Sequence, residues 1–467
     1  MIKLPSFILL LLSMPALLLS QLPGDLDPSF TSSIGSDGYI WSFDFQPEDG
    51  SILIGGEFTT YNGQNARGIC RLTPDGDIDP SFYSGTGFSG NVFAITHLEN
   101  GKALVAGNFS TYNGQNAVDL VQLNQDGSID TEFTGWQGTD GTIWAIALQP
   151  DGKILIGGFF NKINDESRKN LARLNQDGSL DLTFFADCND WVRTIAVQND
   201  ERILIGGDFQ NVNGSESNFI ARIYSDGSVD PTFMDGFGFD AQLRQIDIQP
   251  NGKIIAVGGF SEYNFNANMH ITRINPDGTP DFTFDTGQGP KGWILCCEAQ
   301  PDGRILIGGD FTEYWPKDDF RFSCVLPDGS IEPGFNGGLG PNNTVRLVKS
   351  QNAQKAIIAG NFTSYDNSPV GHIARIYKQP ISSIGNPSTS GQVTLQPNPV
   401  QDYLHIQVSD DHLIQTLEVF NNLGLKMPVH SPSYEKNMID VSNYPSGIYH
   451  LKLSTKSSTY TKVFIKN

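Results

Sequence analysis

Seven phenylalanines, each ending a glycine-containing apolar run, recur along the chain at Phe58, Phe109, Phe160, Phe209, Phe260, Phe311 and Phe362. Five of the intervals between them are 51 residues long and one is 49, so a single unit is copied at a nearly constant period. A short unit repeated in this way must cover its apolar faces with its own copies. The spacing therefore predicts a repeat architecture, in which every copy has the same internal structure.

The third copy illustrates the content of one unit. It holds four short apolar runs, at residues 142–149, 153–160, 170–176 and 179–184. Runs of about six residues that are rich in Ile, Leu, Val and aromatic residues are typical of β-strands. The Asp-Gly pairs at 151–152 and 177–178 suit tight hairpin turns. Each unit is thus predicted to form a four-stranded antiparallel sheet.

Such a unit cannot bury both of its faces alone, because a core of about 50 residues is marginal. An open solenoid would need atypical copies at its ends, and tandem independent domains would each be too small. A closed ring of four-stranded blades is the usual solution at a period of about 40–50 residues. We therefore expect an all-β fold with a seven-bladed β-propeller over residues 21–378.

A second pattern, close to Asp-Gly-x-Ile-Asp-Pro-x-Phe, follows the first six copies and ends at Phe82, Phe133, Phe184, Phe233, Phe284 and Phe335. The seventh copy stops at Ile373–Tyr377 without it, whereas a matching segment, Gly24–Phe30, precedes the first copy. We expect this N-terminal segment to insert as the outer strand of the last blade. It would close the ring and remove an exposed sheet edge.

The remaining segments have different compositions. Residues 1–20 begin with Lys3 and continue as a short apolar run, which predicts a secretory signal peptide. Residues 379–392 are uncharged and rich in Ser, Pro and Gly, as in a linker. Residues 393–467 alternate apolar and polar side chains in short runs, which predicts a small C-terminal β-sandwich. No second apolar run reaches membrane length, so we expect no membrane span.

Two family resemblances rest on these motifs. The runs at residues 78–82, 206–209 and 275–278 resemble the delta-60 repeat, a bacterial β-propeller repeat family, over residues 21–378. The ordered motifs Pro397–Pro399, Tyr444–Tyr449 and Thr461–Lys466 resemble the C-terminal sorting domain of the type IX secretion system of Bacteroidetes. This second resemblance implies a partner in the outer-membrane secretion machinery and a location outside the cell or on its surface. An ordinary accessory sandwich is the alternative for the tail.

Charge narrows the range of partners. The segment from residue 21 to residue 392 carries 23 basic and 45 acidic side chains, so nucleic acid and anionic membranes are poor partners. Strings such as residues 124–130 resemble part of a calcium loop, but they lack its first carboxylate and its bidentate glutamate. Hairpin turns explain them better. Weak calcium binding remains the alternative, and no other cofactor is expected.

Arginines recur on the predicted third strands, at Arg71, Arg173, Arg222, Arg273 and Arg375, with Gln122 and Cys324 in the other two copies. Contacts with repeat aspartates such as Asp79 and Asp181, across strands or between blades, are the favoured explanation. Binding of ligand carboxylates is the alternative.

The candidate ligand-binding position lies near the start of each predicted first strand. It is occupied by Trp41, Phe93, Trp144, Arg193, Arg244, Leu295 and Arg346. First strands line the axis of a propeller, so these side chains are expected at one mouth of the central channel. Aromatic faces beside guanidinium groups can hold sugars, or an acidic or aromatic ligand. Packing between blades is the alternative.

No nucleophile elbow, zinc-binding helix motif, phosphate loop or dinucleotide fingerprint occurs in the sequence. We therefore expect a secreted or cell-surface binding protein that presents a rigid propeller to a glycan or protein ligand. Two alternatives remain. One is a carbohydrate-active hydrolase or lyase with its site at the channel mouth, and the other is a structural adhesion component whose stability depends on calcium.

Overall fold

The computed structural model describes residues 22–30, 34–233, 236–314, 321–336, 338–379, 393–396, 400–408, 416–421, 426–429, 438–445, 447–454 and 459–466. The predicted signal peptide lies outside the described residues, as does the predicted linker apart from Gln379. The chain divides into two compact units, with a boundary between Ile381 and Ser382.

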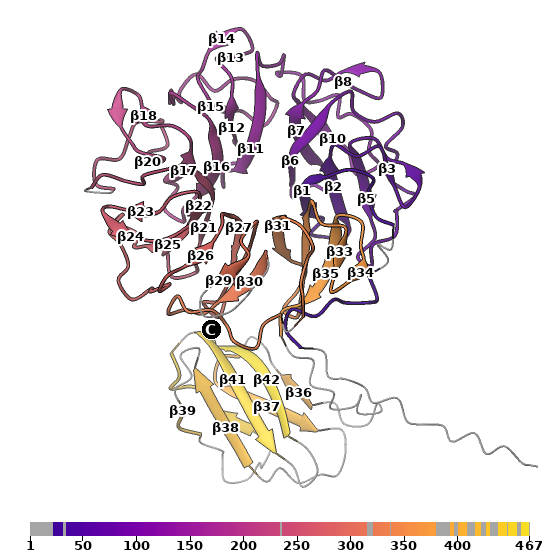
Figure 1. Ribbon diagram of the computed structural model, residues 1–467. Coiled ribbons are helices and arrows are strands. Elements are labelled where there is room, and N and C mark those ends of the chain that lie inside the picture. Colours follow the sequence, from indigo (N-terminus) through magenta and orange to yellow (C-terminus); the bar gives the residue numbers. More distant parts are fainter. Residues whose placement is uncertain are drawn as a thin grey trace, which may run out of the picture. The chain divides into compact units, whose positions relative to one another are not determined.

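The first unit is a ring of antiparallel sheets (Figure 1). Its described residues form seven three-stranded sheets, one for each sequence copy, and the second strand of each copy lies in the middle. The first strands of successive sheets contact one another, and β1 also contacts β31, so the ring is closed. The prediction of an all-β propeller is confirmed, and the number of these sheets equals the number of blades expected from the sequence. The sheets are β1 (Ile40–Phe45), β2 (Ile52–Gly56) and β5 (Ile69–Leu72); β6 (Asn91–His97), β7 (Ala103–Asn108) and β10 (Leu120–Leu123); β11 (Thr142–Leu148), β12 (Ile154–Phe159) and β15 (Leu171–Leu174); β16 (Val192–Val197), β17 (Ile203–Gly207) and β20 (Ile220–Ile223); β21 (Leu243–Ile248), β22 (Ile254–Gly258) and β25 (Ile271–Ile274); β27 (Ile294–Ala299), β28 (Ile305–Gly309) and β30 (Phe322–Val325); and β31 (Val345–Ser350), β32 (Lys355–Gly360) and β35 (Ile373–Tyr377).

Short two-residue strands fill the connection between the second and third strands of each sheet. In most copies they pair with each other, whereas β29 (Glu313–Tyr314) pairs with β26 (Pro290–Lys291). The other pairs are β3 (Thr60–Tyr61) with β4 (Gln64–Asn65), β8 (Thr111–Tyr112) with β9 (Gln115–Asn116), β13 (Lys162–Ile163) with β14 (Glu166–Ser167), β18 (Asn211–Val212) with β19 (Ser215–Glu216), β23 (Glu262–Tyr263) with β24 (Asn266–Ala267), and β33 (Ser364–Tyr365) with β34 (Ser368–Pro369).

The outer, fourth strand of each blade is shorter than the sequence pattern predicts. In the first blade it pairs with the third strand through one bridge, between Leu72 and Ile78. The chain then turns, because the Phe82 N–H donates to the Asp79 carbonyl oxygen. The same bridge recurs at Ile129, Leu180, Val229, Pro280 and Ile331. The fourth strand is therefore a single bridge followed by a turn.

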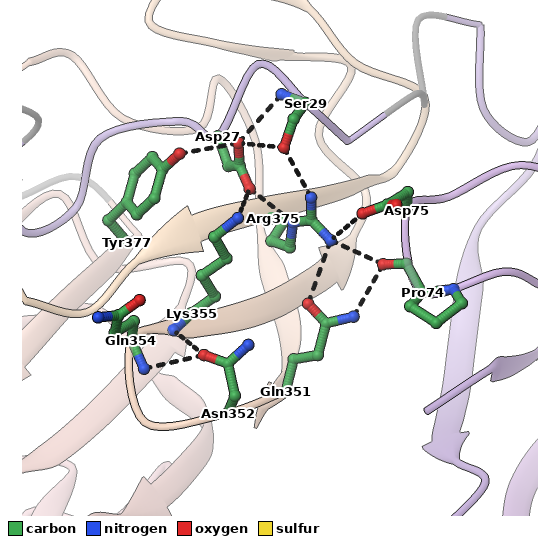
Figure 2. A network of polar contacts seen from close by, with 10 residues as sticks. All are labelled: Asp27, Ser29, Pro74, Asp75, Gln351, Asn352, Gln354, Lys355, Arg375 and Tyr377. Atoms are coloured by element: carbon green, nitrogen blue, oxygen red, sulfur yellow. Dashed lines mark hydrogen bonds and ion pairs between the residues drawn. The ribbon is translucent and has the colours of Figure 1, made fainter. Parts of the chain in front are cut away.

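The N-terminal segment completes the seventh blade, as predicted. Leu26 bridges to Ile376, and the N–H groups of Gly24 and Asp27 donate to the carbonyl oxygens of Tyr377 and Arg375 at 2.7 and 2.8 Å. Figure 2 shows the polar network around the buried Asp27 carboxylate, which contacts Arg375 and Lys355 at 2.7 Å each and the Tyr377 hydroxyl at 2.9 Å. Arg375 also donates to the Pro74 carbonyl oxygen of the first blade at 2.7 Å. The segment thus joins the last blade to the first.

The other third-strand arginines repeat this arrangement. Arg173, for example, pairs with Asp181 at 2.8 Å, donates to the Ser225 carbonyl oxygen of the next blade at 2.5 Å, and lies over the Phe184 ring at 4.8 Å. Equivalent contacts exist for Arg71, Arg222 and Arg273. The predicted cross-strand and inter-blade contacts of these arginines are confirmed, and they keep neighbouring blades in fixed register.

The second unit is a β-sandwich, as predicted. One sheet has the order β36 (Val393–Gln396), β37 (Tyr403–Val408), β40 (Met438–Asp440), and the other has the order β39 (Lys426–Met427), β38 (Thr416–Asn421), β41 (Gly447–Ser454), β42 (Thr459–Lys466). Leu404 and Ile439 from the first sheet share one core with Val419 and Leu451 from the second. The motif tyrosine Tyr444 is buried in this core, whereas Pro397–Pro399 lie outside the described residues. Within the described ranges, no helix is long and apolar enough to cross a membrane.

Candidate binding site

A β-bulge places every residue of the predicted binding position. In each of the seven sheets the pairing of the first strand with the second skips one residue. The skipped residues are Trp41, Phe93, Trp144, Arg193, Arg244, Leu295 and Arg346. A bulged residue is unpaired in the ladder, and the local bend re-aims its side chain.

In every second strand, a glycine pairs with the residue just before the bulge and makes room for it, and in four of the seven strands a second glycine precedes this one. In the first blade, a Cβ on Gly56 would lie 2.1 Å from the Tyr39 carbonyl oxygen, on the strand that carries Trp41. A Cβ on Gly55 would lie 2.4 Å from Val92 of the next blade. Larger residues would push apart either the bulged strand or the neighbouring blade. The repeated glycines are therefore a structural requirement of the ring.

The bulged residues line one cavity of about 610 Å³ at the centre of the propeller. The structure thus brings together all six residues predicted to bind ligand, Trp41, Phe93, Trp144, Arg193, Arg244 and Arg346, with Leu295 between the last two arginines. The wall also includes Trp293 and Asp310. A volume of this size is within the usual range for small-molecule pockets.

The first three blades supply an aromatic arc. The rings of Phe93 and Trp144 stack with centroids 4.5 Å apart, and Trp41 meets both edge-on at 5.9 and 6.0 Å. All three side chains are half-buried. The Trp41 Nε1–H is buried and has no hydrogen-bond partner among the described residues. The arc therefore offers flat apolar surface and one unused donor.

The arginines form the opposite arc, and each lies over an aromatic ring. Arg346 lies over Trp41 at 4.3 Å, Arg193 over Trp191 at 4.8 Å and Arg244 over Trp293 at 5.3 Å. Such cation–π contacts hold a guanidinium group in a fixed orientation. The three arginines are thus positioned before any ligand binds.

Burial disfavours the charged form of two of these arginines, Arg244 and Arg346. It lowers the pKa of Arg244 to about 10, and the nearby charge of Arg193 adds to the effect. Burial also lowers the pKa of Arg346. Both groups keep their charge at neutral pH. The cavity is therefore cationic within a chain whose formal net charge is −21.

The sequence analysis compared one position in each copy and therefore did not select four residues at or beside this site, which are Trp191, Trp293, Asp208 and Asp310. Trp191 and Trp293 lie two residues before Arg193 and Leu295, and alternate residues of a strand share a face, so the same comparison at that offset would have found them. Asp208 and Asp310 each directly precede a repeat phenylalanine. Their proximity to the cavity depends on strand pairing, which one sequence does not specify.

The strings that resemble calcium loops form hairpin turns. In the second blade, Oδ1 of Asp126 accepts hydrogen bonds from the N–H and the hydroxyl of Ser128 at 2.9 and 2.6 Å. Asp177, Asp226, Asp277 and Asp328 make the same pair of bonds within their own turns. One carboxylate oxygen of each aspartate is thus engaged by the turn.

Comparison with known families agrees with both resemblances. Residues 48–82, 98–133, 149–184, 198–233, 249–284 and 300–335 match the family described as a domain of unknown function (DUF5122) beta-propeller. Residues 394–467 match the family described as a secretion system C-terminal sorting domain. The propeller repeats and the sorting domain predicted from the motifs are confirmed.

Solved structures provide similar folds at low identity. The WD40 beta propeller domain of Doa1 is 14% identical with a TM-score of 0.48, over 77% of this chain and 97% of that chain. The extracellular domain of the putative hybrid two component system BT4673 from B. thetaiotaomicron is 12% identical with a TM-score of 0.47, over 96% of this chain and 59% of that chain. No curated protein matches the chain significantly.

Proposed function

We propose that this chain, which carries DUF5122 beta-propeller repeats followed by a type IX secretion system sorting domain, is a binding protein that presents its central cavity outside the cell. The sorting domain accounts for export to the cell surface or the surrounding medium. The propeller accounts for binding. Its ligand enters the cavity and contacts Trp41, Phe93, Trp144, Arg193, Arg244 and Arg346.

The observation that carries the proposal is the convergence of the bulged residues on one cavity. The aromatic arc provides apolar faces of the kind that stack on the C–H face of a sugar ring. The arginine arc provides oriented donors that fix a polar ligand. Because repeated arginine hydrogen bonds to backbone carbonyl oxygens join neighbouring blades, these groups are pre-organised, which reduces the entropy lost on binding.

Binding is favoured over catalysis by the chemistry of the wall. Glycoside hydrolysis ordinarily uses two carboxyl groups on either side of the scissile bond. Asp310 is the single carboxylate among the described residues that line the cavity, and its Oδ1 accepts a hydrogen bond from the Trp293 N–H at 2.7 Å. Asp208 lies nearby in a bidentate pair with Arg193. Each of these two carboxylates is thus already engaged by a group of the protein.

A binding screen tests the proposal. The full exported protein is titrated with a panel of soluble oligosaccharides while tryptophan fluorescence and heat of binding are followed. We expect at least one oligosaccharide to bind, and Trp41→Ala or Trp144→Ala to weaken it at least tenfold. Tyr83→Ala is the matched control, because Tyr83 is an exposed aromatic residue outside the cavity. A ligand whose affinity is unchanged by both tryptophan substitutions would contradict a site in the cavity.

A further inference from the structure

The three cavity arginines differ in the polar partners of their guanidinium groups. Arg193 makes a bidentate pair with Asp208, with distances of 2.7 and 2.6 Å. Arg346 donates from Nε to the Asn361 side-chain oxygen at 2.8 Å. Arg244 is not in an ion pair among the described residues, and its buried Nε–H has no hydrogen-bond partner there. Of the three cavity arginines, Arg244 alone has no polar partner for its guanidinium group among the described residues.

The reason lies at one repeat position. Asp208 and Asn361 each stand 15 residues after the arginine that they hold, immediately before the repeat phenylalanine. The residue at the same offset from Arg244 is Gly259. A Cβ on Gly259 would lie 3.0 Å from the ring of Trp293, which occupies the space of the missing side chain. The ring of Trp293 thus stands where the fourth and seventh blades have a hydrogen-bond acceptor, Asp208 and Asn361.

The surrounding charges leave Arg244 uncompensated. Two other arginines face it, and the carboxylate of Asp208 is engaged by Arg193. The other carboxylate whose charge acts on Arg244, that of Asp310, accepts a hydrogen bond from the Trp293 backbone N–H. A buried polar group without a partner destabilises the folded state, and more so when it is charged. A ligand that supplies an acceptor at this point would remove this destabilisation.

We infer that Arg244 is the specificity-determining residue for a carboxylate-bearing saccharide, such as a short uronate oligosaccharide. This inference rests on the function proposed above. A carboxylate presents two oxygens in the plane that a guanidinium fork matches. A sugar ring next to that carboxylate would lie against the aromatic arc of Trp41, Phe93 and Trp144. A peptide carboxylate satisfies Arg244 equally, but a backbone makes less use of the flat arc opposite.

The test uses matched ligands that differ only in charge. Trimers of galacturonate, glucuronate and mannuronate are titrated calorimetrically into the full protein, each beside its fully methyl-esterified form. We expect at least one acid trimer to bind at least tenfold more tightly than its ester. Arg244→Gln should reduce the affinity for that acid to the level of the ester and leave the affinity for the ester within twofold.

Two further variants separate specificity from folding. Arg304→Gln removes an arginine that pairs with Asp302 and Glu332 outside the cavity, and it should leave both affinities unchanged. Arg244→Lys keeps the charge but not the fork, and it should retain part of the preference for the acid. Unchanged melting temperatures of the Arg244 variants would show that they fold.

The outcomes distinguish this inference from the proposed function. Equal binding of acid and ester, with both weakened by Trp41→Ala, overturns the role of Arg244 and leaves the binding cavity intact. Binding of a peptide with a free C-terminal carboxylate through Arg244, without any saccharide, overturns the saccharide assignment. Absence of binding by these trimers and by the neutral panel overturns both.

Discussion

The closure of the ring by Asp27 leads to a quantitative prediction. Its carboxylate is 1% exposed and contacts two cations, Arg375 and Lys355, at 2.7 Å each. Removal of one partner from a buried ion pair costs about 3–5 kcal/mol, because the remaining charge is left uncompensated. For a unit of this size, that loss in the free energy of unfolding lowers the melting temperature by roughly 4–7 °C. We expect this shift for Asp27→Ala.

The chain contains a matched control for this substitution. Asp181 is 4% exposed and contacts Arg173 at 2.8 Å and Lys153 at 2.7 Å, so its local environment closely resembles that of Asp27. The chain continues on both sides of Asp181 into neighbouring strands, whereas residues 22–30 join the seventh blade without a covalent connection to it. Release of such a segment regains about 1–2 kcal/mol of backbone entropy per residue. Asp27→Ala should therefore also open the ring locally.

Hydrogen exchange distinguishes the two effects. Thermal melts should show a similar loss for Asp181→Ala and Asp27→Ala at the global transition. Mass-spectrometric exchange should show faster exchange at residues 22–30 and 373–377 in Asp27→Ala alone. If both variants lose the same stability and residues 22–30 keep their protection, closure does not depend on the Asp27 network.

The pH dependence of the same network has a definite sign. Burial alone would raise the pKa of Asp27, but hydrogen bonds from Lys355 and Ser29 outweigh it and hold the pKa well below its ordinary value of 3.8. The stabilisation is therefore fully present above about pH 4 and declines as the pH falls below that value. The melting temperature of Asp27→Ala should approach that of the parent protein in strong acid.

Three further predictions concern other blades. Gln122→Arg should raise the melting temperature by about 1–2 °C. An arginine there can reach the Gln176 carbonyl oxygen across a cavity of about 510 Å³ between the second and third blades. An unchanged or lower melting temperature would refute this. Burial raises the pKa of Asp119 to about 6 against an ordinary 3.8, so its charge destabilises the fold increasingly as the pH rises through this range. Asp119→Asn should add about 1–2 kcal/mol at pH 8 and nearly nothing at pH 3 in denaturant titrations, since Asn170 makes the same backbone hydrogen bond in the next blade. Addition of EDTA should leave the thermal melt unchanged, since turn aspartates such as Asp126 use one oxygen within their own turns; a lowered melting temperature would favour calcium.

The order of the strands could be predicted because each copy repeats the same pattern of apolar runs and turn residues. A strand missing after Tyr377 and a spare one at Gly24–Phe30 required only counting, and the predicted closure is confirmed by the Leu26 bridge to Ile376. The short outer strands could not be predicted. The apolar run 179–184 contains both a strand and a turn, and the hydrogen bond from the Phe184 N–H to the Asp181 oxygen that ends the strand is a property of the folded chain.

The sequence was sufficient to predict which residues form the candidate site. It was not sufficient to predict the backbone geometry that directs them into the cavity. Alignment of the copies was sufficient to select Trp41 and Arg244 as equivalent residues. The bulge that turns both toward the axis adds one residue to a strand without changing its composition, so nothing in a single copy marks it. The missing partner of Arg244 is visible only once Arg193 and Arg346 are known to bond to the residue 15 positions later, where Arg244 has Gly259.

The pairing of Leu26 with Ile376 affects how the chain reaches its final fold. Asp27 and Arg375 are 348 residues apart, so a growing polypeptide that ends before the last repeat contains only one of the four strands of the seventh blade. Contacts between such distant residues form late, because the intervening chain must first become ordered. Truncation at either end would therefore leave an unpaired strand edge, which is able to pair with a second molecule.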